Sequence, residues 1–182
     1  FRPVNRIDKN TSGLVLCAQN AFAAPELAKT AQKCYLALVE GPLPVGSGRI
    51  DVPIARRGDS IIGRCVREDG KPSVTEYTVL AASASHALVS CFPVGRTHQI
   101  RVHFSWLGHP LAGDSLYGGH TDIIARHALH CAVLRFNRPA DHEPRRVQSP
   151  LPEDFLAACC AAYLPDKEEI QTMLQSVLPC AE

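Results

Sequence analysis

An aspartate near the start of the chain, Asp8, lies between two cations, Arg6 and Lys9, and precedes a Thr-Ser-Gly turn. The turn leads into an apolar run at 14–16. Nearby cations keep a carboxylate in its charged form, and an ionised carboxylate held at the edge of a strand can act as a nucleophile. The alternative for an Asp beside Asn-Thr-Ser-Gly is a residue that caps the turn. Asp8 is therefore our first candidate for chemistry.

Four further blocks follow the Asp8 segment in a fixed order, and together the five blocks resemble the RluA-like pseudouridine synthases. The second block contains Tyr35, and the third contains the run Gly-Arg-Thr-His-Gln-Ile-Arg, which ends at Arg101. The blocks lie at 1–14, 33–41, 95–103 and 108–119, and the fifth is made of 128–131 and 149–155. This ordered set is far more specific than any single motif.

The resemblance implies the roles of three catalytic residues. Asp8 would be the catalytic aspartate, and Arg101 would face it in a salt bridge that keeps the carboxylate charged. Tyr35 would stack on the target base, because an aromatic face partners the π surface of a flipped base, and its hydroxyl could transfer a proton from C5. Without the resemblance, Tyr35 would be a core residue of an apolar strand, and Arg101 a solvent-facing residue of a helix.

Two arginines are candidates for RNA binding. Residues two apart in a strand share a face, so Arg6 and Asp8 should both point into the cleft. Arg6 would contact phosphate or fill the gap left by the target base, which must leave its stack before it enters a pocket. Arg96, at the expected start of a helix, is the second phosphate candidate.

The implied reaction is the isomerisation of uridine to pseudouridine in ribosomal or transfer RNA. The C1′–N1 bond breaks, the base rotates, and the sugar is rejoined through C5. The reaction needs no redox step and no external atom, so we expect no metal and no other cofactor. The residues leave open whether Asp8 attacks the sugar or the base, or assists formation of a glycal.

Three other functions compete with this one. A non-catalytic RNA-binding module on the same scaffold would be expected to lose Asp8 or Arg101, and both are present. A metal-dependent hydrolase built from the eight His is disfavoured because His98 and His103 are five apart, whereas a helical metal pair is four apart. A serine hydrolase at Ser12 is disfavoured because the Gly-x-Ser-x-Gly elbow is absent.

Length and charge agree with a single RNA-binding domain of 182 residues. The net charge is only +1, but residues 1–152 carry 18 basic and 12 acidic side chains. Of the 19 basic residues 14 are Arg, which suits bidentate contacts with phosphate. Eight Cys without a Cys-x-x-Cys pair indicate reduced thiols in a cytoplasmic protein. No apolar stretch approaches the length of a membrane span, and we expect a monomer that binds no membrane.

Many short strands and few helices predict an α+β fold with a bent, mixed and mostly antiparallel sheet and flanking helices, which is also the fold that the resemblance implies. Expected strands are 14–18, 35–39, 50–54, 74–80, 87–94 and 129–136, with a hairpin or surface loop at 55–72. One expected helix begins near residue 24, and three others span 97–107, 155–163 and 168–177. The catalytic domain would span 1–164, and 165–182 would form a helical tail. The family has an N-terminal strand segment before the first block, so we expect this domain to be N-terminally incomplete.

Overall fold

The structure is a computed structural model that describes residues 1–58 and 60–177. Four helices flank the strands in this part of the chain: α1 (Ala23–Thr30), α2 (Gln99–Trp106), α3 (Glu153–Ala161) and α4 (Lys167–Gln175). The long strands are β4 (Gln32–Glu40), β5 (Gly46–Asp51), β8 (Val74–Ala82), β9 (His86–Pro93), β10 (Leu129–Asn137) and β11 (Pro144–Gln148). The short strands are β1 (Arg2–Pro3), β2 (Ser12–Gly13), β3 (Cys17–Ala18), β6 (Ile54–Arg56) and β7 (Arg64–Val66).

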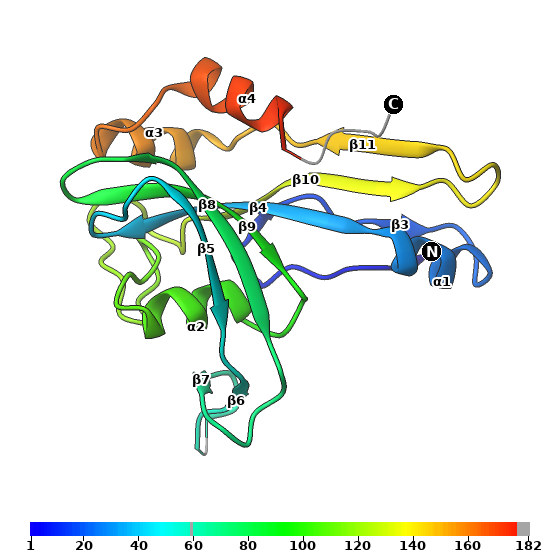
Figure 1. The fold of residues 1–182 in the computed structure, drawn as a ribbon, viewed down its shortest axis with the longest axis horizontal. Helices are drawn as coiled ribbons and strands as arrows, with labels where there is room; N and C mark the ends of the chain where they lie inside the picture. The colour runs from blue at the N-terminus through cyan, green and yellow to red at the C-terminus, as the bar shows by residue number, and fades with distance from the viewer. Residues whose placement is uncertain (59, 178–182) are drawn as a thin grey trace.

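One seven-stranded sheet forms the centre of the fold, with the order β11-β10-β4-β9-β8-β5. Every neighbouring pair in this order is antiparallel, and β2 pairs with β10 in parallel. In Figure 1, β10 and β4 run across the view while β5 and β8 run downwards, so the sheet twists strongly along its length. The predicted α+β fold with a mixed, mostly antiparallel sheet is confirmed.

A buried cluster covers each face of the sheet. Successive side chains of a strand point to opposite faces, so one strand contributes to both clusters. On one face, Leu36 and Leu38 of β4 share a buried cluster with Phe155 of α3. On the other face, Tyr35 of β4 shares a second cluster with Phe104 of α2. Figure 1 shows α3 and α4 above the sheet and α2 below it. This alternation turns Tyr35 towards the α2 side, where the candidate site lies.

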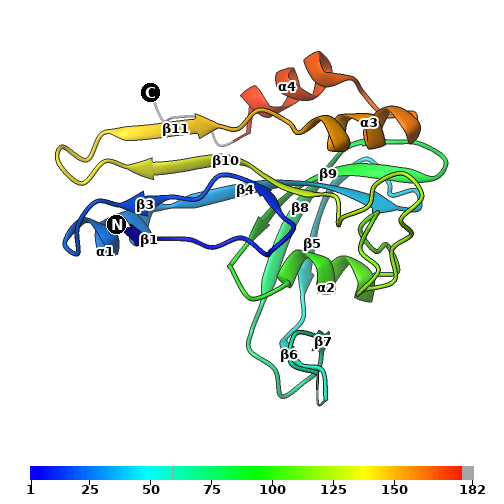
Figure 2. The same cartoon turned by 180° about the vertical axis from the view of Figure 1, so that it is seen from behind.

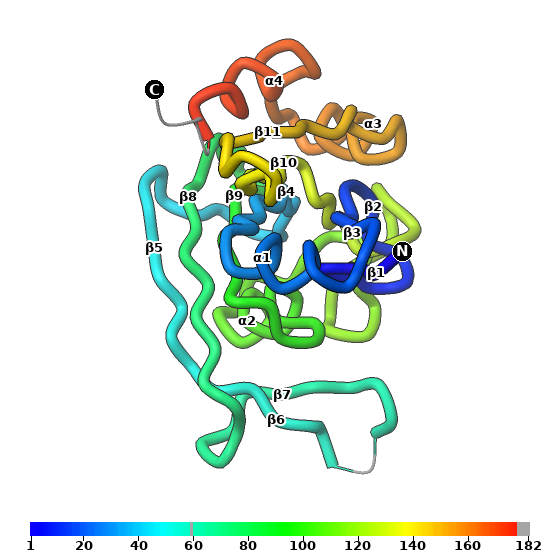
Figure 3. The backbone as a smooth tube through the Cα atoms, turned by 90° about the vertical axis from the view of Figure 1, so that its right-hand side faces the viewer, coloured from blue at the N-terminus to red at the C-terminus, as the bar shows by residue number. Residues whose placement is uncertain are grey.

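A hairpin of β6 and β7 projects beyond α2, as the tube view in Figure 3 shows. It corresponds to the polar segment that the sequence predicted as a hairpin or surface loop. A small third cluster of Ile54, Val102 and Tyr117 joins the base of this hairpin to α2. The hairpin is therefore packed against the helix that carries Arg101.

The parallel pairing of β2 with β10 brings the Asp8 turn onto the sheet, and it depends on Gly13. Gly13 has a φ of 104°, and a Cβ on it would lie 2.2 Å from the carbonyl oxygen of Cys131. Only glycine allows this approach. Figure 2 shows the N-terminal segment from behind, along β4 and β10.

The expected strand at 14–18 forms only at its end, because the side chain of Asn5 makes hydrogen bonds to two backbone groups in this range. Asn5 Oδ1 accepts a hydrogen bond of 2.6 Å from the Leu16 amide, and its Nδ2 donates to the Leu14 carbonyl over 3.4 Å. Only β3 forms there, paired with β1. The expected strand at 50–54 is also interrupted, because Pro53 separates β5 from β6 and offers no amide donor.

Other elements differ from the prediction mainly at their ends. The helix expected from 97 begins at Gln99, because His98 has the left-handed φ of 56°. Strand β11 was not predicted, since Pro-Arg-Arg-Val-Gln carries little apolar pattern and lies at the sheet edge. In the expected tail, Ile170 and Leu174 of α4 are fully buried in the cluster of Phe155. Residues 178–182 of that tail lie outside the described residues, and the division at 164 stays a prediction.

Candidate active site

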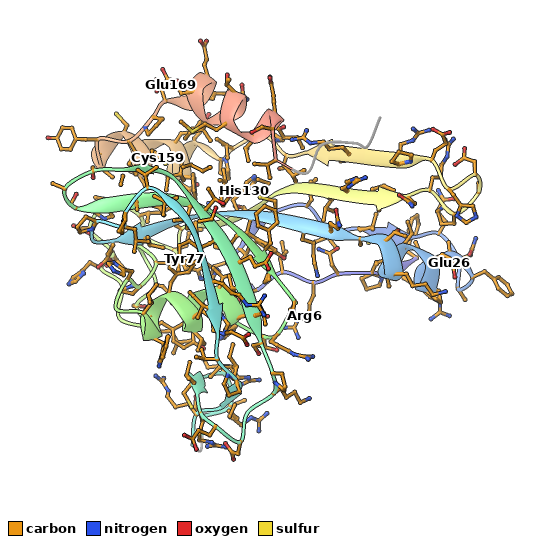
Figure 4. The ribbon with its side chains drawn as sticks, in the orientation of Figure 1. Arg6, Glu26, Tyr77, His130, Cys159 and Glu169 are labelled. Carbon is orange, nitrogen blue, oxygen red and sulfur yellow. The ribbon has the colours of Figure 1, made fainter. Side chains whose placement is uncertain are left out.

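A cleft of ≈ 860 Å³ opens between the N-terminal segment, the start of α2 and the β6–β7 hairpin. Asp8 and Tyr35 line it, and its other charged lining residues are mostly basic: Arg6, Lys33, Arg56, Arg64, Lys71 and Arg96, against the acidic Asp69. Figure 4 labels Arg6 on the side of the sheet that faces the hairpin. The cleft therefore surrounds the carboxylate of Asp8 with mostly basic side chains, which attract a polyanion.

Asp8 forms an ion pair with Arg101 at the base of this cleft. Nη1 of Arg101 lies 3.3 Å from Oδ2 of Asp8, and their side chains are only 6% and 15% exposed. Arg101 itself does not line the cleft among the described residues, so it supports Asp8 from behind. A buried guanidinium at this distance compensates the charge of the carboxylate and restricts its rotation.

Asp114 fixes the orientation of Arg101. Its Oδ2 and Oδ1 accept hydrogen bonds of 2.7 Å from Nε and 2.8 Å from Nη2 of Arg101. Burial alone would lower the pKa of Arg101, but Asp114 and then Asp8 raise it above its ordinary value. The Tyr117 ring centroid lies 4.9 Å from the guanidinium carbon, a cation–π contact. Arg101 is thus permanently charged and aimed at Asp8.

Tyr35 lies in the cleft wall and is only 7% exposed. Burial, with smaller contributions from Cys131 and the charge of Asp8, strongly raises the pKa of the Tyr35 hydroxyl. The phenol therefore keeps its proton at neutral pH. In the free protein it is a hydrogen-bond donor, and its ring is available to a base that enters the cleft.

The loop before α2 is shaped by the amide of Gln99. Its Oε1 accepts hydrogen bonds from the backbone amides of Gly95 and Arg96 over 3.0 and 2.8 Å. Its Nε2 donates to the Val74 carbonyl over 2.6 Å. The buried Gln99 therefore ties this loop to β8 and presents the exposed Arg96 to the cleft.

Two buried histidines hold the turn that carries Asp8. Thr11 Oγ1 lies 2.8 Å from Nε2 of His127, and Ser12 Oγ lies 2.9 Å from Nδ1 of His130. Burial lowers the pKa of each histidine to about 4, so both are neutral at pH 7. The amide of Thr11 also donates to the Asp8 carbonyl over 3.0 Å. These bonds connect the Asp8 turn to the chain just before and within β10.

The structure brings the predicted site residues together, with one difference in local structure. Asp8, Tyr35, Arg6 and Arg96 all line the cleft, and Arg101 reaches Asp8. Arg6 and Asp8 do not lie in a strand, so the reason given for their shared direction, the alternation of side chains along a strand, was wrong. Both residues nevertheless line the same cleft.

Sequence reasoning missed the contribution of the fourth block. Asp114 in this block was not among the predicted site residues, yet it is 2% exposed and holds Arg101. An Asp within an apolar, glycine-rich block is the signal that could have indicated a buried partner. His103 is structural: its Nδ1 lies 2.9 Å from Thr75 Oγ1 and its Nε2 3.1 Å from the Val52 carbonyl.

Within residues 1–58 and 60–177, no group of three or more His, Cys, Asp or Glu side chains forms an arrangement that could hold a metal ion. In the same ranges no helix is both long and apolar enough to cross a membrane. The seven cysteines of the described chain are free, and Cys180 lies outside it.

Comparison with known proteins decides the family. Residues 1–106 match the family model of RNA pseudouridylate synthases. The chain belongs to the RNA pseudouridylate synthase family. The resemblance to its RluA-like members, expected from the five blocks, is confirmed.

Individual pseudouridine synthases support the same assignment. The chain is 43% identical over 158 residues to YjbO of Bacillus subtilis (strain 168), described as an uncharacterized RNA pseudouridine synthase, with 84% of this chain and 56% of that protein covered. It is 39% identical over 172 residues to ribosomal large subunit pseudouridine synthase D of Xanthomonas campestris pv. campestris, covering 84% and 52%. The chain spans about half the length of the curated relatives it matches.

A solved pseudouridylate synthase structure shares the fold. Human RNA pseudouridylate synthase domain containing 1 superposes with a TM-score of 0.74 at 29% identity, covering 100% of this chain and 82% of that one. Human RNA pseudouridylate synthase domain containing 4 gives a TM-score of 0.71 at 26% identity, covering 90% and 76%.

Proposed function

We propose that this chain carries the catalytic centre of an RNA pseudouridine synthase, which isomerises uridine in RNA with Asp8 as nucleophile. The observation that supports this most directly is the Asp8 carboxylate at the base of a basic cleft, 3.3 Å from a buried arginine. Arg101 compensates the charge of Asp8 at this distance and does not itself line the cleft. An anionic carboxylate serves each of the three chemical courses that the sequence leaves open.

The reaction is balanced without a further reactant. The C1′–N1 bond breaks and a C1′–C5 bond forms, while C5 loses its proton and N1 gains one. A protonated Tyr35 above the base can stack and donate a hydrogen bond, but it is not a base in the free protein. We infer that Tyr35 holds the base while it turns.

The walls of the cleft supply the contacts that RNA requires. Arg6 and Arg96 are exposed at its rim, and Arg96 is oriented by a hydrogen bond of 3.3 Å from its Nε to the Pro72 carbonyl. Arginine binds phosphate through a planar fork. Entry of a uridine to Asp8 requires that the nucleotide leave its stack, and Arg6 is the side chain that can fill the space it vacates.

The test is an Asp8→Asn substitution, because the amide has nearly the same shape but cannot act as an anionic nucleophile. Release of tritium from RNA that contains 5-tritiated uridine reports isomerisation, since C5 loses its hydrogen. We expect turnover by the wild-type chain, none by Asp8→Asn, and RNA affinity within about twofold in both. Appreciable turnover by Asp8→Asn would remove Asp8 from the mechanism, and an inactive wild type that binds RNA would favour a non-catalytic binding module.

The substrate is the finer part of the proposal. The relative named ribosomal large subunit pseudouridine synthase D supports ribosomal RNA as substrate, and transfer RNA is the second class to test. Mapping of pseudouridine in cellular RNA with and without the gene separates them. A monomeric state and a cytoplasmic location stay predictions, which light scattering and cell fractionation check.

A further inference from the structure

Tyr117 lies where the β6–β7 hairpin meets α2, and it contacts both the hairpin and the partner of Asp8. Its hydroxyl accepts a hydrogen bond of 3.0 Å from the backbone amide of Arg64 in β7. Its ring lies over the Arg101 guanidinium. The residue is 8% exposed and packs with Ile54 and Val102. Tyr117 therefore links one wall of the cleft to the base of the site.

The same hydroxyl also contacts the ring of His98. The Tyr117 oxygen lies 2.7 Å from Nδ1 of His98. The amide of Arg64 already donates to this oxygen, and the hydroxyl's own hydrogen has Nδ1 as its acceptor among the described residues. Burial lowers the pKa of His98, and the charge of Asp8 only partly opposes this, so the ring is neutral at pH 7. A hydroxyl that donates to Nδ1 leaves the single proton of a neutral imidazole on Nε2.

Nε2 is the ring nitrogen of His98 that approaches Asp8. Nε2 lies 3.9 Å from Oδ2 of Asp8, the same oxygen that receives Nη1 of Arg101 at 3.3 Å. The opposite tautomer would aim a lone pair at the carboxylate. No donor of the described residues makes a hydrogen bond to Oδ1 of Asp8. The guanidinium of Arg101 and the neutral ring of His98 therefore both approach the same oxygen of Asp8.

We propose that Tyr117 is a positioning residue: its hydroxyl holds His98 as the Nε2–H tautomer, so that His98 and Arg101 together engage Oδ2 of Asp8 and leave Oδ1 facing the substrate. The proposal rests on the proposed function of Asp8. It adds that the hairpin wall is tied, through the Arg64 amide and Tyr117, to the orientation of the catalytic carboxylate.

The first test is spectroscopic and needs no substrate. Imidazole ¹⁵N resonances are measured at pH 7 in the wild type and in Tyr117→Phe, with His98→Asn to assign the His98 signals. Asn suits the left-handed conformation of position 98. We expect a neutral Nε2–H ring in the wild type and a mixture of tautomers in Tyr117→Phe. A wild-type ring that is Nδ1–H or doubly protonated, or a tautomer unchanged in Tyr117→Phe, would overturn the proposal.

The second test is kinetic and uses Tyr163→Phe as matched control, because Tyr163 is 90% exposed. Loss of the hydrogen bond that holds His98 beside Asp8 should lower kcat about tenfold in Tyr117→Phe. KM should stay within about twofold, and the control should keep wild-type values. A purely structural role would lower thermal stability and leave kcat unchanged below the unfolding range. An inactive wild type defeats the proposed function, whereas an active wild type matched by Tyr117→Phe defeats only the role of Tyr117.

Discussion

Asp114 holds two nitrogen atoms of Arg101, Nε at 2.7 Å and Nη2 at 2.8 Å, and leaves Nη1 to Asp8. The guanidinium thus bridges two carboxylates, one structural and almost fully buried, the other at the base of the cleft. Because the fork is planar, fixing two of its nitrogens also fixes the direction of the third. Asp114 therefore influences the position of Asp8 through Arg101. Among the described residues, no hydrogen bond joins Asp8 and Asp114 directly.

Asp114→Asn should therefore lower both stability and activity. The amide keeps the shape and one acceptor oxygen but removes the charge that neutralises buried Arg101. We expect a loss of about 2 kcal/mol in the free energy of unfolding, since hydrogen bonds to charged groups are worth about 1.5–3 kcal/mol. Urea unfolding measures this, and the exposed Asp122→Asn is the control. Equal stability of the two variants would contradict the bridging role.

Arg101→Met should abolish most activity while leaving RNA affinity nearly unchanged, because Arg101 supports Asp8 from outside the cleft lining. Loss of a preorganised charge typically lowers kcat by about 10²-fold or more. Arg101→Lys should restore little, since one ammonium cannot serve both carboxylates with the geometry of a fork. Arg138→Met, on the exposed turn after β10, is the control. Single-turnover rates and RNA binding are measured together, and near-normal turnover in Arg101→Met would exclude this role.

Substitutions of Tyr35 should separate its ring from its hydroxyl. Tyr35→Phe keeps the aromatic face and should bind RNA like the wild type. Tyr35→Leu loses the stacking platform, and stacking of a base on an aromatic side chain is worth about 1–3 kcal/mol. Fluorescence binding to a short RNA with one unpaired uridine measures the difference. If the Leu and Phe variants bind equally well, Tyr35 is a core residue and not a stacking partner.

RNA affinity should fall as salt rises, because the cleft carries six basic side chains against Asp8 and Asp69. Each neutralised phosphate contributes roughly 0.7–0.9 to the slope of log affinity against log salt. Arg6→Gln and Arg96→Gln should each reduce the slope by about one such step, whereas Arg138→Gln should not. A flat slope that neither cleft variant changes would show that the basic excess is an ordinary solvated surface.

Acid should destabilise the fold through the buried histidines. The pKa of His127 lies near 4 in the folded protein against an ordinary value of 6.5, so between these values the unfolded chain binds more protons. Stability is fully present above about pH 6.5 and is lost as the pH falls towards 4. From pH 7 to 5 we expect His127 to contribute a loss of about 2 kcal/mol.

His127→Gln should reduce the pH dependence of the free energy of unfolding by that amount. The control is His142→Asn, an exposed position whose φ of 59° suits Asn. Denaturant unfolding at pH 7, 6 and 5 measures the dependence. An unchanged pH dependence in His127→Gln would mean that His127 is not held neutral by its burial against Thr11.

The sequence by itself determined the strands whose patterns are local and strong. The runs in β4, β8, β9 and β10 carry enough apolar and β-branched residues to predict a strand without knowing its neighbours. The ordered blocks also predicted Asp8, Tyr35 and Arg101 as a set. A resemblance to a family depends only on residue types and their order along the chain, and both can be read from the sequence. None of this required a distance.

Only the tertiary structure decided how those residues meet. Asp8 and Arg101 are 93 residues apart in the chain, and their contact depends on the parallel pairing of β2 with β10 that Gly13 permits. The clamp by Asp114 and the link from Tyr117 through His98 are likewise contacts between separate elements. A hydrogen bond depends on the relative placement of two backbones to within a few tenths of an ångström. That placement comes from packing of the whole fold, and no local pattern encodes it.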